Sequence, residues 1–172
     1  VVIVPPNPGV TSAMGCLLVD IQHDFSDSFM ADAETTKPED LETAFKKIEM
    51  EAVERLRHEG VEPKNTVLQR TIEMMYQGQW RSLAVPAPAS ITSTSDLIEG
   101  FHNQHEREYN FRREDAPVSI FRVSVKATGV VPKVELPSFE VVHYAPIPFD
   151  RRDVWFENKP YKTDVYARKD FK

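Results

Sequence analysis

Two histidines one helical turn apart are the first candidates for chemistry in this sequence. His102 and His105 are three residues apart, so a helix would place both side chains on the same side. A metal site would need at least one further ligand, and the sequence offers neither a cysteine pair nor an H-E-x-x-H motif. We therefore interpret both histidines as packed, hydrogen-bonded side chains and predict no metal site.

Two other groups have side chains that could react. His23 and Asp24 follow Asp20 closely, which is the arrangement of a general base with an orienting carboxylate, although such residues also commonly end a helix and contact water. Cys16 is the single cysteine, and the apolar stretch around it offers neither a base nor exposure, so we predict a small buried side chain. The residues thus leave the catalytic groups unknown.

Small residues gather where the first helix is expected to begin. Glycine and other small residues at a helix N-terminus let the backbone approach another group closely, and the free amides favour an anion. Close packing of the helix against another element is the alternative, and the sequence leaves both open. The candidate residues are Pro8, Gly9, Ser12, Ala13 and Gly15.

The hydrophobic pattern predicts the elements that must position these residues. A strand at Val1–Val4 and a core helix at Ala13–Asp24 come first, followed by a strand at Phe25–Met30. A long helix begins near Pro38 and ends at Gly60, with Leu41, Phe45, Ile48, Ala52 and Leu56 on its buried side. Next we expect a strand at Thr66–Tyr76, a turn at Gln77-Gly78, a strand at Trp80–Val85, a helix at Asp96–Tyr109 and a strand at Pro117–Thr128.

This order predicts the α+β class and, within it, a ferredoxin-like split βαβ sandwich, in which two helices cover one face of an antiparallel sheet. We expect that domain to span residues 25–129. Residues 1–24 would be the end of another domain, and residues 130–172, rich in proline and aromatic side chains, would form an extended arm.

Composition excludes several classes of function. The net charge of −6 argues against nucleic acid and against an anionic membrane surface, since both require clustered Lys and Arg. One cysteine rules out an internal disulfide and suits the cytoplasm. No apolar run approaches the roughly 20 residues of a transmembrane helix.

Three stretches in register resemble one family, the hydantoinase A/5-oxoprolinase proteins. Residues 4–15, Val-Pro-Pro-Asn-Pro-Gly-Val-Thr-Ser-Ala-Met-Gly, resemble the segment that closes the family's ATPase core of the actin/hexokinase kind. Tyr76-Gln77-Gly78-Gln79 is similar to its Tyr-x-Gly-Gln turn. Phe101–His105, with Tyr109, Phe111 and Pro117-Val118, is similar to its Phe-His-x-x-His…Tyr-Gly-Phe…Pro-Val stretch, although Asn110 stands where the family usually has Gly and Ser119 where an acidic residue is common.

The resemblance implies a C-terminal portion or split subunit of an ATP-dependent hydantoinase, oxoprolinase or ketone carboxylase. ATP and Mg²⁺ would serve the assembled enzyme, and none is predicted for this chain alone. Its partners would be the missing N-terminal ATPase part, a hydantoinase B-type subunit and a small-molecule substrate, in a hetero-oligomer. The five small residues from Pro8 to Gly15 would line the edge of the nucleotide or substrate cleft. A ferredoxin-like module that binds a small ligand or regulates, without catalysis, is the alternative.

Overall fold

The computed structural model describes residues 8–135 and 145–168. It divides the chain into two compact units, the first reaching to Val134 and the second beginning at Glu135. The strand predicted at Val1–Val4 lies outside the described residues. The three-part division at residues 24 and 129 stays a prediction.

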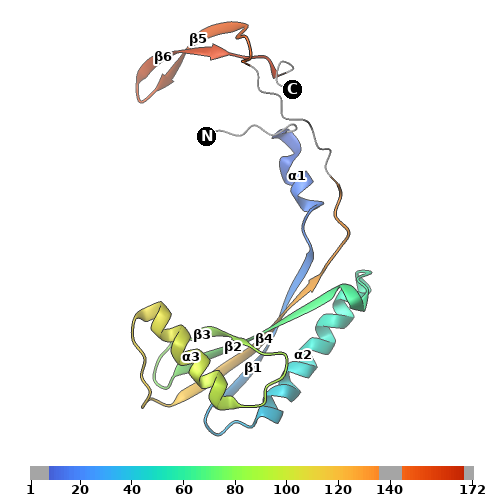
Figure 1. Ribbon diagram of the computed structural model, residues 1–172, viewed down its shortest axis with the longest axis vertical. Coiled ribbons are helices and arrows are strands. Elements are labelled where there is room, and N and C mark those ends of the chain that lie inside the picture. The colour runs from blue at the N-terminus through green and yellow to red at the C-terminus, as the bar shows by residue number, and fades with distance from the viewer. Residues whose placement is uncertain (1–7, 136–144, 169–172) are drawn as a thin grey trace. The chain divides into compact units, whose positions relative to one another are not determined.

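A four-stranded antiparallel sheet forms the first unit (Figure 1). Its strands are β1 (Ile21–Asp32), β2 (Thr66–Tyr76), β3 (Leu83–Ala87) and β4 (Val118–Gly129), in the order β1-β4-β2-β3. β4 and β2 are therefore central. β1 and β2 both run antiparallel to β4, and β3 and β4 both run antiparallel to β2. Each parallel pair thus has an antiparallel strand between its members.

Two helices connect these parallel pairs and cover one face of the sheet. α2 (Pro38–His58) joins β1 to β2, with the short 3-10 helix η2 (Pro63–Asn65) after it, and α3 (Thr94–Tyr109) joins β3 to β4 (Figure 1). This is the split βαβ arrangement, present twice. The predicted α+β class, with its antiparallel sheet and two helices, is confirmed.

The long helix α2 was predictable from the sequence because its start, its buried side and its end each have a clear signal. Pro38 occupies its first turn, where the missing amide costs nothing, and Glu39 and Asp40 lie at the positive end of the helix dipole. Its buried side chains are Leu41, Phe45, Ile48, Ala52 and Leu56, as predicted. Gly60 ends the helical path with a φ of 83°, which side chains other than glycine rarely adopt.

A bulge in β4 changes which of its residues face the core. β2 residues Glu73 and Met74 pair with Arg122 and Ile120, so Phe121 is the extra residue. Val118 and Ile120 are buried before the bulge, and Val123, Val125 and Ala127 after it. Phe121 turns toward the opposite face of the sheet and is only half-buried.

The prediction of a core helix at Ala13–Asp24 was also wrong. Helix α1 is short, spanning Thr11–Cys16, and Ile21 already begins β1. The reason is tertiary: Ile21 and Asp24 pair with Gly129 and Lys126 of β4, a partner strand that local apolar spacing does not reveal. Cys16 is exposed rather than buried.

The hairpin after β2 has a longer loop than predicted. Gly78 has the expected positive φ, 85°, and the Gln79 amide donates to the Tyr76 carbonyl at 3.1 Å. The return strand β3 begins at Leu83 rather than at Trp80. Trp80 lies in the loop with 88% of its side chain exposed. Apolar character alone placed it wrongly in a strand.

The described part of the second unit is a two-stranded hairpin. β5 (Asp150–Phe156) pairs antiparallel with β6 (Lys159–Val165). Glu157 and Asn158 join them with φ values of 47° and 59°, the positive values that a two-residue hairpin turn of type I′ requires. This hairpin lies within the arm predicted for residues 130–172, whose bounds stay a prediction. Among the described helices of the whole chain, none has the length and apolar character needed to cross a membrane.

Candidate functional site

The small residues at the N-terminus occupy two short helices. Pro8 and Gly9 belong to the 3-10 helix η1 (Pro8–Val10), and Ser12, Ala13 and Gly15 to α1. An added Cβ at Gly9 or Gly15 would meet no atom of the chain within 4 Å. Both glycines therefore border open space, and within the described residues no helix packs closely against them.

Open space and apolar surface characterise this segment chemically. Val10, Leu17 and Val19 are more than half exposed, and residues 8–19 contain no Lys or Arg. The segment fits the edge of a nucleotide site, because its backbone is accessible. It does not fit a complete phosphate site, because residues 8–19 offer no cationic side chain to the negative charge of a bound phosphate.

The other two motifs converge on one buried cluster at the end of α3. The Tyr76 hydroxyl lies 2.8 Å from His102 Nδ1, and the backbone amide of Arg113 donates to the same hydroxyl at 2.9 Å. Because an amide can only donate, the hydroxyl oxygen accepts from Arg113, and the same hydroxyl also bonds His102 Nδ1.

His105 fastens the other side of the same loop. Its Nδ1 lies 2.9 Å from the carbonyl oxygen of Phe111, so Nδ1 carries the proton and donates. The rings of Tyr76, Phe101 and Phe111 pack around it at centroid distances of 4.8 to 5.8 Å. Both histidines are buried. Their interpretation as packed, hydrogen-bonded side chains is confirmed.

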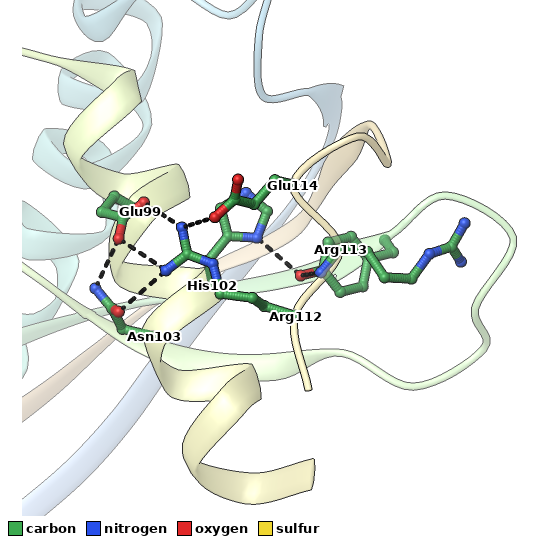
Figure 2. A network of polar contacts seen from close by, with 7 residues as sticks. Glu99, His102, Asn103, Arg112, Arg113 and Glu114 are labelled. Carbon is green, nitrogen blue, oxygen red and sulfur yellow. Dashed lines mark hydrogen bonds and ion pairs between the residues drawn. The ribbon is translucent and has the colours of Figure 1, made fainter. Parts of the chain in front are cut away.

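An ion-pair network covers this cluster from outside. Arg112 binds both carboxylate oxygens of Glu99, at 3.1 and 3.2 Å, and Glu114 at 2.8 Å (Figure 2). The hydrogen bond from Arg112 holds the pKa of Glu99 below its usual range, and the same contact raises the pKa of Arg112. Within the described residues, the buried Nε of Arg112 has no hydrogen-bond partner.

This cluster holds the loop at residues 110–117 against α3 and β2. The Tyr76 hydroxyl and His105 Nδ1 bond the loop backbone at Arg113 and Phe111, and His102 Nδ1 bonds the Tyr76 hydroxyl. No group of three or more His, Cys, Asp or Glu residues within ranges 8–135 and 145–168 is arranged to hold a metal ion. The aromatic and histidine motifs thus explain how α3, β2 and the loop are held together.

His23 has a different partner from the one that its sequence neighbours predict. It lies on β1, and its Nε2 is 2.8 Å from Glu59 at the end of α2. Asp24 points to the opposite face of the sheet, because successive strand residues alternate. The dyad of His23 and Asp24 as a general base is therefore not formed.

Arg70 is the polar residue of the core that sequence reasoning missed. It binds Glu49 through Nε at 2.6 Å and Glu42 through Nη1 at 2.8 Å, and its guanidinium group stacks 4.7 Å from the Phe45 ring centre. Glu42 also accepts the Ile91 amide at 2.7 Å. A signal existed: Arg70 shares the buried parity of Ile72, and the two glutamates are two helical turns apart on one side of α2.

Comparison with protein families identifies this architecture. A model of the hydantoinase/oxoprolinase C-terminal domain matches residues 28–171. The chain belongs to the hydantoinase/oxoprolinase C-terminal domain family. The resemblance predicted from the three motifs is confirmed.

Relatives of this hydantoinase/oxoprolinase C-terminal domain are much longer proteins. An uncharacterised protein of Methanocaldococcus jannaschii is 30% identical over 167 residues, which are 97% of this chain and 24% of that protein. An uncharacterised protein of Schizosaccharomyces pombe is 20% identical over 174 residues, covering 96% of this chain and 13% of that protein. The chain thus spans a quarter or less of these relatives.

Solved structures share the fold of this hydantoinase/oxoprolinase C-terminal domain. A nucleotide-free acetone carboxylase, described as ATP-dependent, matches with a TM-score of 0.74 at 19% identity, over 97% of this chain and 26% of its own. An ATP-dependent caprolactamase from Pseudomonas jessenii matches with a TM-score of 0.67 at 22% identity, over 90% of this chain and 24% of its own.

Proposed function

We propose that this domain is one part of a larger ATP-dependent enzyme that acts on a cyclic amide or a ketone. The supporting observation is the fold match, over nearly the whole chain, to about a quarter of an ATP-dependent acetone carboxylase. When bound, ATP with Mg²⁺ would supply a phosphoryl group that makes an unreactive carbonyl or enol oxygen a better leaving group. This chain supplies a wall of the cleft and surfaces for assembly.

The cleft wall is the segment of small residues before β1. Pro8, Gly9, Ser12, Ala13 and Gly15 border open space, so that a nucleotide or substrate can approach their backbone. Groups outside this segment neutralise the phosphates, because residues 8–19 are uncharged. A leucine in place of Gly15 is expected to raise the KM of the complete enzyme for ATP or substrate. An unchanged KM would remove this segment from the cleft.

The assembly partners are the nucleotide-binding part of the enzyme and a hydantoinase B-type subunit, in a cytoplasmic hetero-oligomer. Exposed Val10, Leu17 and Val19 support a partner at the N-terminal segment, since apolar side chains gathered on a surface favour burial against protein. Whether this chain is a natural subunit or a portion of a longer one does not change this role.

A small-ligand-binding module without catalysis is the second candidate. One observation favours it: a cavity of about 120 Å³ lies between β3 and α3, with Ser90, Thr92, Ser93 and Asp96 in its wall. Pockets for small ligands usually enclose about 300 Å³ or more, so this cavity suits at most a very small polar molecule.

Thermal unfolding of the isolated chain separates the two functions. The enzyme-part proposal predicts that the melting temperature rises when the remainder of the enzyme is added as a separate polypeptide, and stays constant with lactams, hydantoins or ketones alone. The module proposal predicts the reverse. A melting temperature that responds to neither addition would contradict both.

A further inference from the structure

The β5–β6 hairpin has one face whose apolar side chains lack a cover. Paired residues on neighbouring strands share a face, so the pairing of Val154 with Tyr161 and of Phe156 with Lys159 places these side chains together. Val154, Phe156 and Tyr161 form what we call the apolar face. Their side chains are 42%, 66% and 51% exposed.

The opposite face of the hairpin is suited to water. Arg151 binds Asp164 across the strands at 2.6 Å, and Lys162 binds Asp153 at 2.9 Å. These two cross-strand pairs match the charges of the four residues that form them, and Trp155 adds a large apolar side chain beside them. The two faces therefore differ in chemistry.

An isolated two-stranded hairpin is marginally stable at best in water, because it has no core of its own. Every residue of β5 is exposed, and among the described residues of this unit none is buried. The turn geometry and the ion pairs fix the register but bury little apolar area. Burial of Val154, Phe156 and Tyr161 against another apolar surface would therefore stabilise the hairpin.

The remainder of a longer enzyme is one source of such a cover. The family match extends to residue 171, so the hairpin belongs to the shared domain rather than to an appended tail. The chain accounts for only 24% of the archaeal relative, so most of that protein is available as a partner surface. Resting on the proposed function, we infer that the apolar face docks on the remaining part of the ATP-dependent enzyme.

Charge indicates the character of that partner surface. Arg152 and Lys159 flank the apolar face and lie on the same side of the hairpin. Neither takes part in the two cross-strand ion pairs of the described hairpin. Complementarity then predicts an apolar surface that receives the two aromatic rings, with carboxylates at its rim opposite the two cations.

Hydroxyl-radical labelling of the native enzyme and of the isolated chain tests this docking. Phe156 and Tyr161 are expected to be labelled several-fold more slowly in the native enzyme, while Trp155 on the opposite face keeps its rate. Equal rates in the two forms would overturn the inference. Full protection in the isolated chain would also overturn it, because the same chain would then cover these residues. Protection that grows with the concentration of the isolated chain would overturn it as well, because a second copy would then be the cover.

Two neighbouring substitutions provide a matched comparison. In the native enzyme, Tyr161→Ser is expected to speed proteolytic cleavage within residues 150–165 by about tenfold, as truncation of a central interface aromatic does to binding. Lys162→Ser, on the other face, is expected to leave the cleavage rate unchanged. Equal effects of the two variants would contradict docking through the apolar face.

The two proposals fail separately. An enzyme with ATP-dependent activity whose Phe156 and Tyr161 stay fully labelled would retain the proposed function and lose this inference. Protection of the same residues in a native protein without ATP-dependent activity would retain the docking surface and lose the proposed function.

Discussion

The Tyr76 hydroxyl joins three separate parts of the chain through two hydrogen bonds. It accepts from the Arg113 amide and bonds His102 Nδ1, inside a buried cluster. A buried donor or acceptor that loses its partner keeps the cost of leaving water, which exceeds the net gain of an ordinary hydrogen bond. The polar atoms of this cluster therefore depend on one another.

Tyr76→Phe is expected to lower the free energy of unfolding by about 1–3 kcal/mol, since it leaves the Arg113 amide and His102 Nδ1 without partners. Urea denaturation measures this loss. Tyr109→Phe is the matched control, because Tyr109 is 42% exposed, and its effect should stay within about 0.5 kcal/mol. Equal losses in the two variants would show that the buried hydroxyl is not the cause.

The pKa of Glu42 indicates how the free energy of unfolding depends on pH. Burial raises the pKa of Glu42, but hydrogen bonds from Arg70 and from the Ile91 amide outweigh it, and the net pKa is lowered. A lowered folded-state pKa contributes stability that is present above the unfolded value of about 4.3 and is lost as the pH falls through the folded value.

Glu42→Gln is accordingly expected to reduce stability most near neutral pH, and the difference from wild type should shrink below about pH 4. Denaturation curves from pH 7 to pH 2 measure the difference. Glu108→Gln, on the exposed side of α3, serves as the control and should show no such trend. A Glu42→Gln difference that grows toward acid would contradict the assigned direction.

Single residues were only partly predictable from sequence. Spacing placed His102 and His105 on the packed side of a helix correctly, since helical periodicity is local. The partners of His102, His23 and Arg70 were not predictable, because each lies 21 to 36 residues away and depends on tertiary contacts.

At the level of elements, the end of α3 explains a departure from the family pattern. Asn110 caps this helix with φ 61° and ψ 24°, a left-handed conformation in which glycine and asparagine are the usual residues. Asparagine at the position where the family usually has glycine therefore preserves the backbone path. Sequence showed the substitution, and the dihedral angles show why it is compatible.

Asn110→Val is expected to cost about 1–2 kcal/mol of stability, because a β-branched side chain disfavours this conformation. Asn110→Gly should be neutral within about 0.5 kcal/mol. Thermal or urea unfolding compares the three proteins. A Val variant as stable as the Gly variant would show that the left-handed cap carries no strain.

Gly129 lets the end of β4 lie against the loop after α2. A Cβ added there would come within 2.6 Å of Val61 Cγ2 and 3.1 Å of Leu56 Cδ2. Gly129→Ala is therefore expected to cost about 1–3 kcal/mol through overpacking. In a Val61→Ala background the same change should cost clearly less, because the closest neighbour is gone. Additive effects in a double-mutant cycle would contradict this contact.

Elements were the most predictable level of the structure. The bounds of β2 matched the prediction, and α2 began where expected, because their periodicity is long and their capping residues are clear. The first helix and the start of β3 were wrong, since apolar residues at Leu17–Val19 and at Trp80 lie on the surface. Apolar composition alone does not distinguish residues of the core from residues of an exposed apolar surface.

At the scale of the whole molecule, the chain combines one filled core with two poorly covered surfaces. The helix-covered side of the sheet forms the core. The segment at residues 8–19 and the β5–β6 hairpin each expose apolar side chains instead. A domain that spans only about a quarter of its structural neighbours is expected to show such surfaces, since the longer proteins can bury them.

Phosphate release from ATP by the purified 172-residue chain, with Mg²⁺ and with cyclic amides or ketones present, tests the central claim most directly. We predict no release above buffer from the isolated chain, and ATP-dependent turnover from the native enzyme that contains it, because we propose that the groups that hold phosphates lie outside this chain. Sustained ATP hydrolysis by the isolated chain would contradict the account.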